Sequence, residues 1–204
     1  MKNLLLWLVV FTLLSGCQSN LSPDVLPILG VPDLGPNGDS VAHTIPDFRL
    51  IDQDSNVITN ETFAGKAYVA DFFFIACPTI CPITTKQMLR IHDHFKDEPR
   101  LELMGHTLAP KYDTVAALNR YAKNLGVSAN KWHFVTGDQA TIYDLAPEYM
   151  NVALTDEDAP GGINHSGYLI LVDKNRHIRS FCNGTDPEEV TRFIKDIEKL
   201  LNEQ

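Results

Sequence analysis

A pair of cysteines directly after a long apolar run constrains the fold of this chain more than any other feature. Residues 67–75 read Ala-Tyr-Val-Ala-Asp-Phe-Phe-Phe-Ile, and residues 77–82 read Cys-Pro-Thr-Ile-Cys-Pro. An apolar, aromatic run of this length predicts a buried strand, and the Pro-rich segment after it predicts a turn into a helix. The sequence therefore predicts two thiols at the junction between a buried strand and the start of a helix.

The junction of strand and helix favours reactive thiols. A helix start has unpaired backbone N–H groups and the positive end of the helix dipole, so a cysteine there loses its proton more easily than a free thiol. The spacing of Cys77 and Cys81 places both sulfurs on one face of a helical turn, where they can share a metal ion or form a disulfide. Thioredoxin-type redox motifs have one residue fewer between their cysteines, so this spacing favours metal binding without excluding redox chemistry. A purely structural disulfide is disfavoured, because it would close too small a loop to stabilise the fold.

The N-terminus has the features of a secretion signal. Lys2 precedes an apolar stretch over residues 4–14, and residues 14–17 read Leu-Ser-Gly-Cys. The stretch is too short for a membrane-spanning helix. Residues 14–17 resemble the bacterial lipobox, which implies a lipoprotein signal peptide at residues 1–16 and lipid on Cys17; an ordinary secretory signal is the alternative. We expect a protein of the bacterial cell envelope that is extracytoplasmic and lipid-anchored to a membrane.

Charge and length narrow the classes of function. The chain has 17 Lys and Arg against 26 Asp and Glu, a net charge of −9. Because no basic cluster is present, a nucleic-acid partner is not expected. The length after the signal suits one domain with a full hydrophobic core. Of the cysteines, Cys17 is assigned to the lipid, and Cys182 is expected to be a buried, unreactive thiol.

The chain after the signal divides into two parts. Residues 17–45 are rich in Pro, Gly, Ser, Asp and Asn without a sustained periodicity, which indicates a flexible tether. Residues 46–204 alternate strand-like and helix-like segments, which predicts an α/β fold with a central mixed β-sheet flanked by helices and an N-terminal β-hairpin. Asp113 is expected to cap the second helix. The strands are expected at 48–52, 57–59, 67–75, 101–108, 132–135, 168–172 and 178–181, and the helices at 83–95, 114–125 and 186–201.

The order of these elements resembles the thioredoxin fold, and residues 65–82 are similar to the Sco family of copper-binding assembly factors for cytochrome c oxidase. The resemblance extends over residues 46–198. In that family, two thiolates of a Cys-Pro-x-x-Cys-Pro motif and a distant histidine followed by serine bind copper. The resemblance therefore implies that Cys77, Cys81 and His165 are the copper ligands, and that the copper-bearing subunit of cytochrome c oxidase is the partner.

Three positions differ from the pattern that is common in the family. Thr79 stands in place of an acidic residue, Asn164 in place of an Asp before the ligand histidine, and Ala109 in place of an Asp before proline. None of these changes removes a ligand. Because position 164 is Asn, the carboxylate that is common next to the ligand histidine is absent. We therefore expect this chain to differ from the common family pattern in redox tuning and in the choice of partner.

The first hypothesis is a membrane-tethered copper chaperone, which is not an enzyme. Two thiolates and one imidazole form a soft donor set that suits Cu(I), and Cu(II) is accommodated if further ligands join. His165 lies in a Gly-rich segment, residues 161–167, which is expected to be a flexible loop just before a strand. A mobile ligand would help the protein to capture and release copper.

The alternative hypothesis is an extracytoplasmic thiol-disulfide reductase that acts on the cysteines of a partner. Cys77 would be the attacking thiolate, because it is nearer the start of the helix, and Cys81 would resolve the mixed disulfide. The chaperone requires His165 and the reductase does not. His106 and Asp71 are weaker candidates. His106 follows a strand and is considered as a neighbour of the site. Asp71 is expected to be a hydrogen-bonded structural carboxylate, because an unpaired one is costly to bury.

Overall fold

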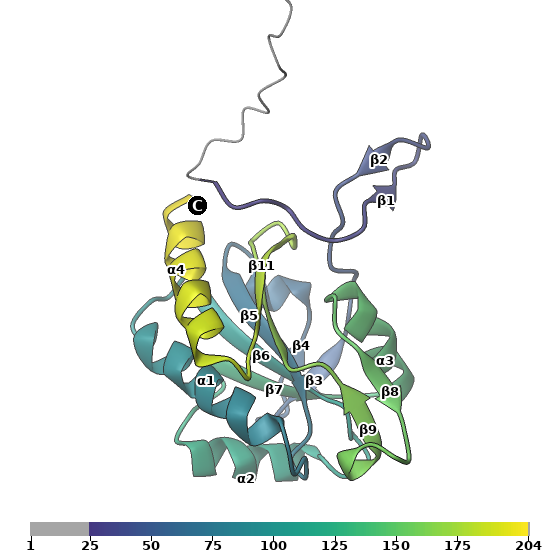
Figure 1. Cartoon of the computed structure of the whole chain (residues 1–204), viewed down its shortest axis with the longest axis vertical. Helices are drawn as coiled ribbons and strands as arrows, with labels where there is room; N and C mark the ends of the chain where they lie inside the picture. The colour runs from purple at the N-terminus through teal and green to yellow at the C-terminus, as the bar shows by residue number, and fades with distance from the viewer. Residues whose placement is uncertain (1–24, 204) are drawn as a thin grey trace, which may run out of the picture.

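The protein is built around a seven-stranded mixed β-sheet with helices on both of its faces (Figure 1). The computed structural model describes residues 25–203. The order of strands across the sheet is β11-β10-β5-β6-β7-β3-β4. These strands are β3 (Leu50–Asp52), β4 (Val57–Ile58), β5 (Ala67–Phe73), β6 (Leu101–Thr107), β7 (Trp132–Thr136), β10 (Tyr168–Val172) and β11 (Ile178–Asn183). The helices are α1 (Cys81–His94), α2 (Val115–Leu125), α3 (Gln139–Glu148) and α4 (Pro187–Glu203).

Strand pairing explains where the helices lie. β5 pairs in parallel with β6, and β6 with β7, whereas the other neighbouring strands of this sheet are antiparallel. Parallel neighbours need a crossover connection, which α1 and α2 supply. β5 has a strand on each side, and all 7 of its residues are buried, which accounts for its apolar composition. The predicted α/β fold with a mixed sheet and the predicted hairpin, β3–β4, are confirmed.

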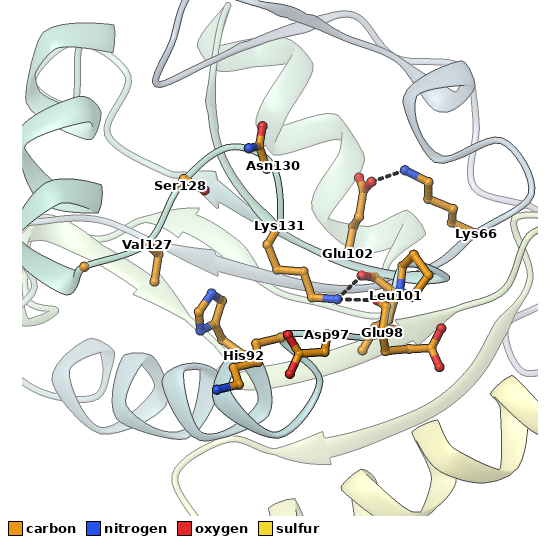
Figure 2. A pocket seen from close by; sticks show the side chains of 13 residues that line it. Lys66, His92, Asp97, Glu98, Leu101, Glu102, Val127, Ser128, Asn130 and Lys131 are labelled. Carbon is orange, nitrogen blue, oxygen red and sulfur yellow. Dashed lines mark hydrogen bonds and ion pairs between the residues drawn. The ribbon is translucent and has the colours of Figure 1, made fainter.

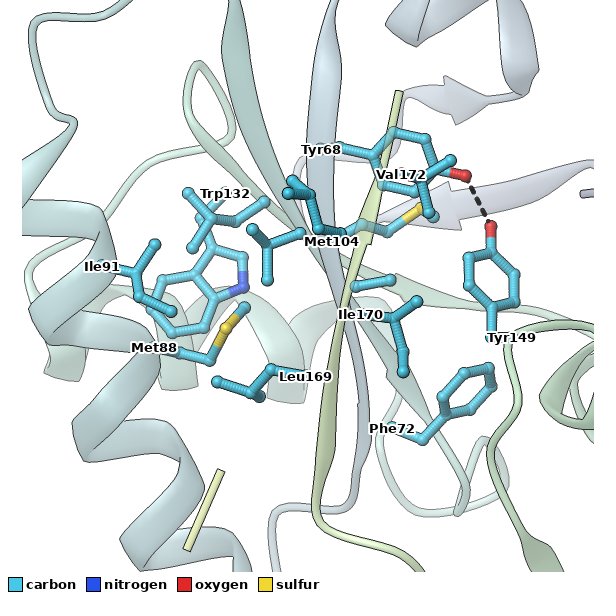
Figure 3. Packing of buried hydrophobic residues seen from close by; sticks show 14 of the residues in the cluster. Tyr68, Phe72, Met88, Ile91, Met104, Trp132, Tyr149, Leu169, Ile170 and Val172 are labelled. Atoms are coloured by element: carbon cyan, nitrogen blue, oxygen red, sulfur yellow. Dashed lines mark hydrogen bonds between the residues drawn. The ribbon is translucent and has the colours of Figure 1, made fainter. Parts of the chain in front are cut away.

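The two faces of the sheet carry separate layers of the core (Figure 3). On one face, Met88 and Ile91 of α1 pack with Trp132, and all three side chains are buried. On the other face, Tyr149 lies with its ring centroid 5.7 Å from that of Phe72. Successive residues of a strand point to opposite faces, so β5 contributes to both layers. The buried stripe of α1 holds this helix against the sheet and thereby positions its first turn.

Some elements have no counterpart among the predicted segments. Helix α3 and a small separate sheet of β8 (Ala153–Thr155) with β9 (Ile163–His165) lie in a region where no local pattern predicts them. Helix α1 begins at Cys81, earlier than the expected start at residue 83. The expected cap of α2 is wrong: Thr114, not Asp113, accepts a hydrogen bond from the backbone N–H of Ala117. Asp113 is buried and accepts other hydrogen bonds, which are described below.

Residues 25–45, expected to form part of a tether, contact the domain in part: Leu26, His43 and Ile45 are buried, whereas residues 36–41 are exposed. The backbone N–H of Leu29 donates to the carbonyl of Ile178 at 2.8 Å, and β1 (Asp33–Leu34) pairs with β2 (Ser40–Val41). The division into leader, tether and domain stays a prediction, and Cys17 lies outside the described residues. Among residues 25–203, the helices lack the length and apolar composition that crossing a membrane requires.

A chain of buried charges lies near the amino-terminal ends of the parallel strands. His133 lies 3.1 Å from Asp52 and 3.3 Å from Glu102, and Glu102 also pairs with Lys66. Lys66 and Glu102 line a polar cavity of about 610 Å³, in which Lys131 donates to two backbone carbonyls (Figure 2). This cavity lies at the opposite end of β5 from the cysteines. Because Glu102 is paired with both Lys66 and His133, this buried cluster stabilises the fold.

We expect His133→Gln to destabilise the protein in a pH-dependent way. Burial by itself lowers the pKa of His133, but its hydrogen bonds to Glu102 and Asp52 outweigh burial and raise the pKa above the ordinary value of 6.5. The contribution of the imidazolium is therefore fully present below the ordinary pKa and is lost as pH rises through the raised pKa. The free energy of unfolding should fall by about 2 kcal/mol at acidic pH and by less in alkali. Urea unfolding measured from about pH 6 to pH 9 tests this, and a loss that grows toward alkaline pH would contradict it.

Candidate metal centre

Three side chains from separate parts of the chain meet at the carboxyl end of β5. Cys77 lies in the turn after β5, Cys81 is the first residue of α1, and His165 is the last residue of β9. The Nε2 atom of His165 lies 3.8 Å from Sγ of Cys77 and 3.5 Å from Sγ of Cys81. All three ligand atoms lie within 4.8 Å of one another, and both cysteines are free thiols. A single metal ion between these atoms can contact all three.

The imidazole of His165 is oriented for metal binding. Its Nδ1 atom lies 3.3 Å from the backbone carbonyl of Ser166. A carbonyl can only accept, so Nδ1 carries the proton and Nε2 directs its lone pair at the sulfurs. Burial lowers the pKa of His165, and the hydrogen bond to Ser166 offsets only part of this effect. The ring is therefore neutral near neutral pH, which is the form that binds metals.

The two thiols have different acidities. Burial raises the pKa of Cys77, but hydrogen bonds from the backbone of Thr79 and Cys81 and from their side chains outweigh it, and the pKa lies below its ordinary value. Burial raises the pKa of Cys81 far above the ordinary value, and the hydrogen bond and charge of Cys77 add to this shift. Cys77 therefore ionises first, although Cys81 is the first residue of α1. The cause is the set of hydrogen bonds from Thr79 and Cys81, because the thiol at the helix start itself has the raised pKa.

Asp113 holds the turn that precedes Cys77. Its Oδ2 atom accepts hydrogen bonds from the backbone N–H of Ile75 at 3.1 Å and from the hydroxyl of Thr107 at 2.5 Å. The backbone N–H of Cys77 in turn donates to the carbonyl of Phe74 at 3.1 Å. The turn is thereby tied to the end of β6. No local signal reveals this role, because Asp113 also fits the pattern of a helix cap.

The strand that carries His165 is held by a polar clamp. The hydroxyl of Ser166 donates to Oδ1 of Asn151 and accepts from the backbone N–H of Val152 at 3.1 Å. Ala153 of β8 pairs directly with His165 of β9. The expected flexible loop is therefore wrong, since His165 lies in a paired strand. The Gly-rich composition suggests a loop, whereas the pairing depends on β8, which the sequence pattern does not mark.

The aromatic ring of Phe74 packs against the imidazole of His165. The rings of Phe74 and His165 meet edge to face with centroids 5.6 Å apart. Gly161 has φ +80°, and a Cβ atom there would lie only 2.7 Å from the Phe74 ring. Glycine is therefore required at this position both for backbone conformation and for space. Phe74 is a site residue that the sequence pattern does not identify, because a phenylalanine in an apolar run is also expected to be a core residue.

The remaining candidates from the sequence lie elsewhere. Cys182 is buried in β11, as expected. His106 lies in the core, where its ring stacks on Phe72 with centroids 4.4 Å apart, and burial lowers its pKa to about 4. The expected hydrogen bonding of Asp71 is not found for its Oδ1 atom, which is buried and has no hydrogen-bond partner within residues 25–203. Burial raises the pKa of Asp71 to about 7. Neither His106 nor Asp71 belongs to the Cys77, Cys81 and His165 group.

The chain is similar in sequence to proteins of one family. The sequence model of the family described as SCO1/SenC matches residues 37–202. The chain is 24% identical over 161 residues to a SCO1 protein homolog of Bacillus subtilis (strain 168), covering 78% of this chain and 83% of that protein. It is 30% identical over 142 residues to a Stutzerimonas stutzeri protein named for copper binding, covering 66% of this chain and 67% of that protein.

Solved structures of the same family share the fold. A SCO1/SenC family lipoprotein from Bacillus anthracis str. Ames matches with a TM-score of 0.71 and 22% identity, over 78% of this chain and 95% of that one. BsSco, a member of the Sco family of cytochrome c oxidase assembly proteins, matches with a TM-score of 0.68 and 24% identity, over 78% and 93%. Arabidopsis thaliana ScoI with copper bound matches with a TM-score of 0.66 and 22% identity, over 80% and 100%. The predicted thioredoxin-like fold is confirmed.

Proposed function

The chain belongs to the SCO1/SenC family, and on this premise we propose that it is a copper chaperone with Cys77, Cys81 and His165 as its copper ligands. The observation that carries the proposal is the position of Nε2 of His165, 3.8 Å and 3.5 Å from the two sulfurs. Two thiolates and one imidazole suit Cu(I), whereas a zinc site would normally have a fourth ligand. A copper-binding relative and the copper-bound ScoI structure support the choice of metal.

The proposed site is suited to releasing its cargo. A Cu(I) ion with three ligands leaves room for the thiolate of a receiving protein, which can replace the ligands of this chain one at a time. Cu(II) would use the same donors together with an additional ligand. The copper ion is thus a cargo that passes through the site.

We further propose that the protein works at a membrane of the bacterial cell envelope. Residues 1–16 would be removed, Cys17 would carry the lipid anchor, and residues 17–45 would connect the anchor to a copper-binding domain at 46–204. The Bacillus anthracis relative is a lipoprotein, which supports this location. BsSco belongs to a family of cytochrome c oxidase assembly proteins, so the copper-bearing subunit of this oxidase is the proposed receiver. The acidic chain, with a net charge of −9, is not expected to bind nucleic acid.

An anaerobic copper titration tests the proposed function. The reduced full chain in detergent is titrated with Cu(I) in competition with a chromophoric chelator, and the stoichiometry and affinity are measured. We expect one tightly bound equivalent per chain. Binding that the chelator abolishes at equimolar concentration would overturn the proposal and leave thiol-disulfide exchange as the function.

The second candidate function is a thiol-disulfide reductase, with Cys77 as attacking and Cys81 as resolving cysteine. The observation that favours it is the lowered pKa of Cys77 beside a second free thiol. In this reaction the Cys77 thiolate would attack a partner disulfide, and Cys81 would then displace the partner's sulfur, so that this chain is oxidised and the partner reduced. His165 has no necessary part in these steps.

We expect Gly161→Ala to weaken copper binding more than Gly162→Ala. Both glycines have positive φ, +80° and +78°, so both substitutions strain the backbone to a similar extent. An added Cβ at Gly161 would also displace Phe74, which contacts His165, whereas a Cβ at Gly162 would meet no atom within 4 Å in the described part of the chain beyond its two neighbours in sequence. The Cu(I) affinity should fall about tenfold for Gly161→Ala, as for other residues that orient a ligand. Equal affinities of the two variants in the chelator competition would show that Phe74 does not position the imidazole.

A further inference from the structure

An apolar groove opens from the two cysteines between α1 and α2. It encloses about 280 Å³, and its wall includes Cys77, Cys81, Phe74 and Ile75. His165 contacts the same two sulfurs but does not line the groove. The groove therefore approaches the sulfurs from a different side than the imidazole does.

The sides of the groove come from one stripe on each helix. Pro82, Lys86 and Leu89 lie along α1, and Tyr121 and Leu125 lie on α2. The two hydroxyl groups among the lining residues, those of Tyr121 and Thr85, lie 3.0 Å apart and form a hydrogen bond with each other. A chain that lies here would meet mainly apolar side chains.

Of the residues that the structure describes, Lys86 is the one charged residue that lines this groove. Its side chain is exposed, and among the described residues it takes part in no ion pair. In a chain with a net charge of −9, a single free cation beside the reactive thiols favours an acidic group on the visiting segment.

We propose that the groove binds an extended segment of the partner protein, in which a cysteine is followed by apolar residues and one acidic residue. From Pro82 to Leu89 the groove follows α1 for about 10 Å, at ~1.5 Å per residue. An extended chain rises ~3.3 Å per residue, so about three residues after the partner's cysteine fit into it. The partner's sulfur then lies at the sulfurs of Cys77 and Cys81, where it can accept copper or exchange a disulfide. This proposal rests on the proposed function, because copper transfer requires a partner thiolate at the site and disulfide exchange requires a sulfur of a partner disulfide there.

The experiment uses two activated peptides and the reduced, copper-free full chain. The probes are acetyl-Cys-Leu-Glu-Leu-amide and acetyl-Cys-Gly-Lys-Gly-amide, each with its sulfur joined to a thiopyridine. A protein thiolate attacks the peptide sulfur, the probe disulfide breaks, and thiopyridine is released and measured by its absorbance. The second protein thiolate then releases the peptide as a thiol, which leaves the protein oxidised and the probe reduced. Each rate is divided by the rate with a small neutral dipyridyl disulfide.

We expect the Leu-Glu-Leu peptide to react about tenfold faster than the Gly-Lys-Gly peptide. The net negative charge of the protein would by itself favour the lysine peptide, so this preference would report on the groove. Ile75→Ser and Lys86→Glu should each remove most of it. Ile83→Ser and Lys123→Glu are the matched controls, since both residues are exposed on the same helices and do not line the groove.

Equal normalised rates for the two peptides would overturn the proposal, as would equal losses in the groove and control variants. A second copy of this chain is the other occupant, and sedimentation equilibrium tests it: dimers that Ile75→Ser dissociates would also overturn the proposal. Copper titration of the same variants separates the two proposals. If the unmodified chain does not bind one equivalent of Cu(I), the proposed chaperone function is refuted. The preference for the Leu-Glu-Leu peptide is measured without copper and tests only the proposed role of the groove.

Discussion

Replacing His165 by alanine is expected to lower the affinity for Cu(I) by more than about 100-fold, while the reactivity of the thiols toward a small disulfide does not fall. Loss of a residue that only orients a ligand typically costs 10- to 100-fold, and His165 itself supplies the third donor atom. Its Nε2 atom lies 3.5 Å from Sγ of Cys81, and its Nδ1 atom is already bound to Ser166. The hydrogen bonds that lower the pKa of Cys77 come from Thr79 and Cys81, so removal of the imidazole leaves these hydrogen bonds in place.

His94→Ala is the matched control for this substitution. His94 is exposed, and its Nε2 atom lies 2.9 Å from Glu198 of α4. Its loss should leave both copper affinity and thiol reactivity unchanged. If His165→Ala binds Cu(I) as tightly as the unmodified chain, the three-ligand site is refuted. If thiol reactivity falls with copper affinity, the variant has disturbed the cysteines, and His165→Gln, which keeps most of the side-chain volume, then separates ligand loss from misfolding.

Arg179→Met is expected to lower the free energy of unfolding by about 3 kcal/mol, because it leaves a buried carboxylate without its cation. The guanidinium donates to Asp173 at 3.0 Å and to Glu203 at 2.6 Å. It also donates to the backbone carbonyls of Leu26 and Pro27 at 2.6 Å and 3.1 Å. Asp173 is only 4% exposed. Methionine replaces the arginine side chain only as far as Nε, and it makes none of these hydrogen bonds.

Urea unfolding measures this loss, and a lower midpoint with an unchanged slope is the expected result. Arg176→Met is the control, since Arg176 pairs with the exposed Asp47 and exposed pairs contribute little. Because Arg179 also holds Leu26, limited proteolysis should cut near residues 25–30 faster in Arg179→Met than in the control. A stability equal to that of the Arg176 variant would contradict the role of this buried cluster.

Local patterns in the sequence predict the helices and strands well where apolar residues form a continuous run or recur on one face of a helix. The apolar run forms β5, and the amphipathic pattern after Pro187 forms α4, whose Val190, Phe193 and Ile197 are buried. The predicted elements fail where a residue type fits two roles. Asp113 fits a helix cap but binds the turn before Cys77, and the Gly-rich segment around His165 fits a loop but contains β9. The partner that decides the role of Asp113 is 38 positions away, and the partner of β9 is the nearby strand β8, which no strand-like pattern in the sequence marks.

The sequence by itself determined the buried strand, the two thiols after it and the helix that follows, because these depend on neighbouring residues. The lowered pKa of Cys77 also comes from nearby residues, Thr79 and Cys81. It also marked His165, through the family resemblance, as the candidate for a third ligand. The tertiary structure alone decided that the imidazole faces the sulfurs, since the contacts join residues 84 and 88 positions apart. They depend on the pairing of β8 with β9 and on the space that Gly161 leaves for Phe74. Such contacts arise from packing between elements, which leaves no periodic signal in the sequence.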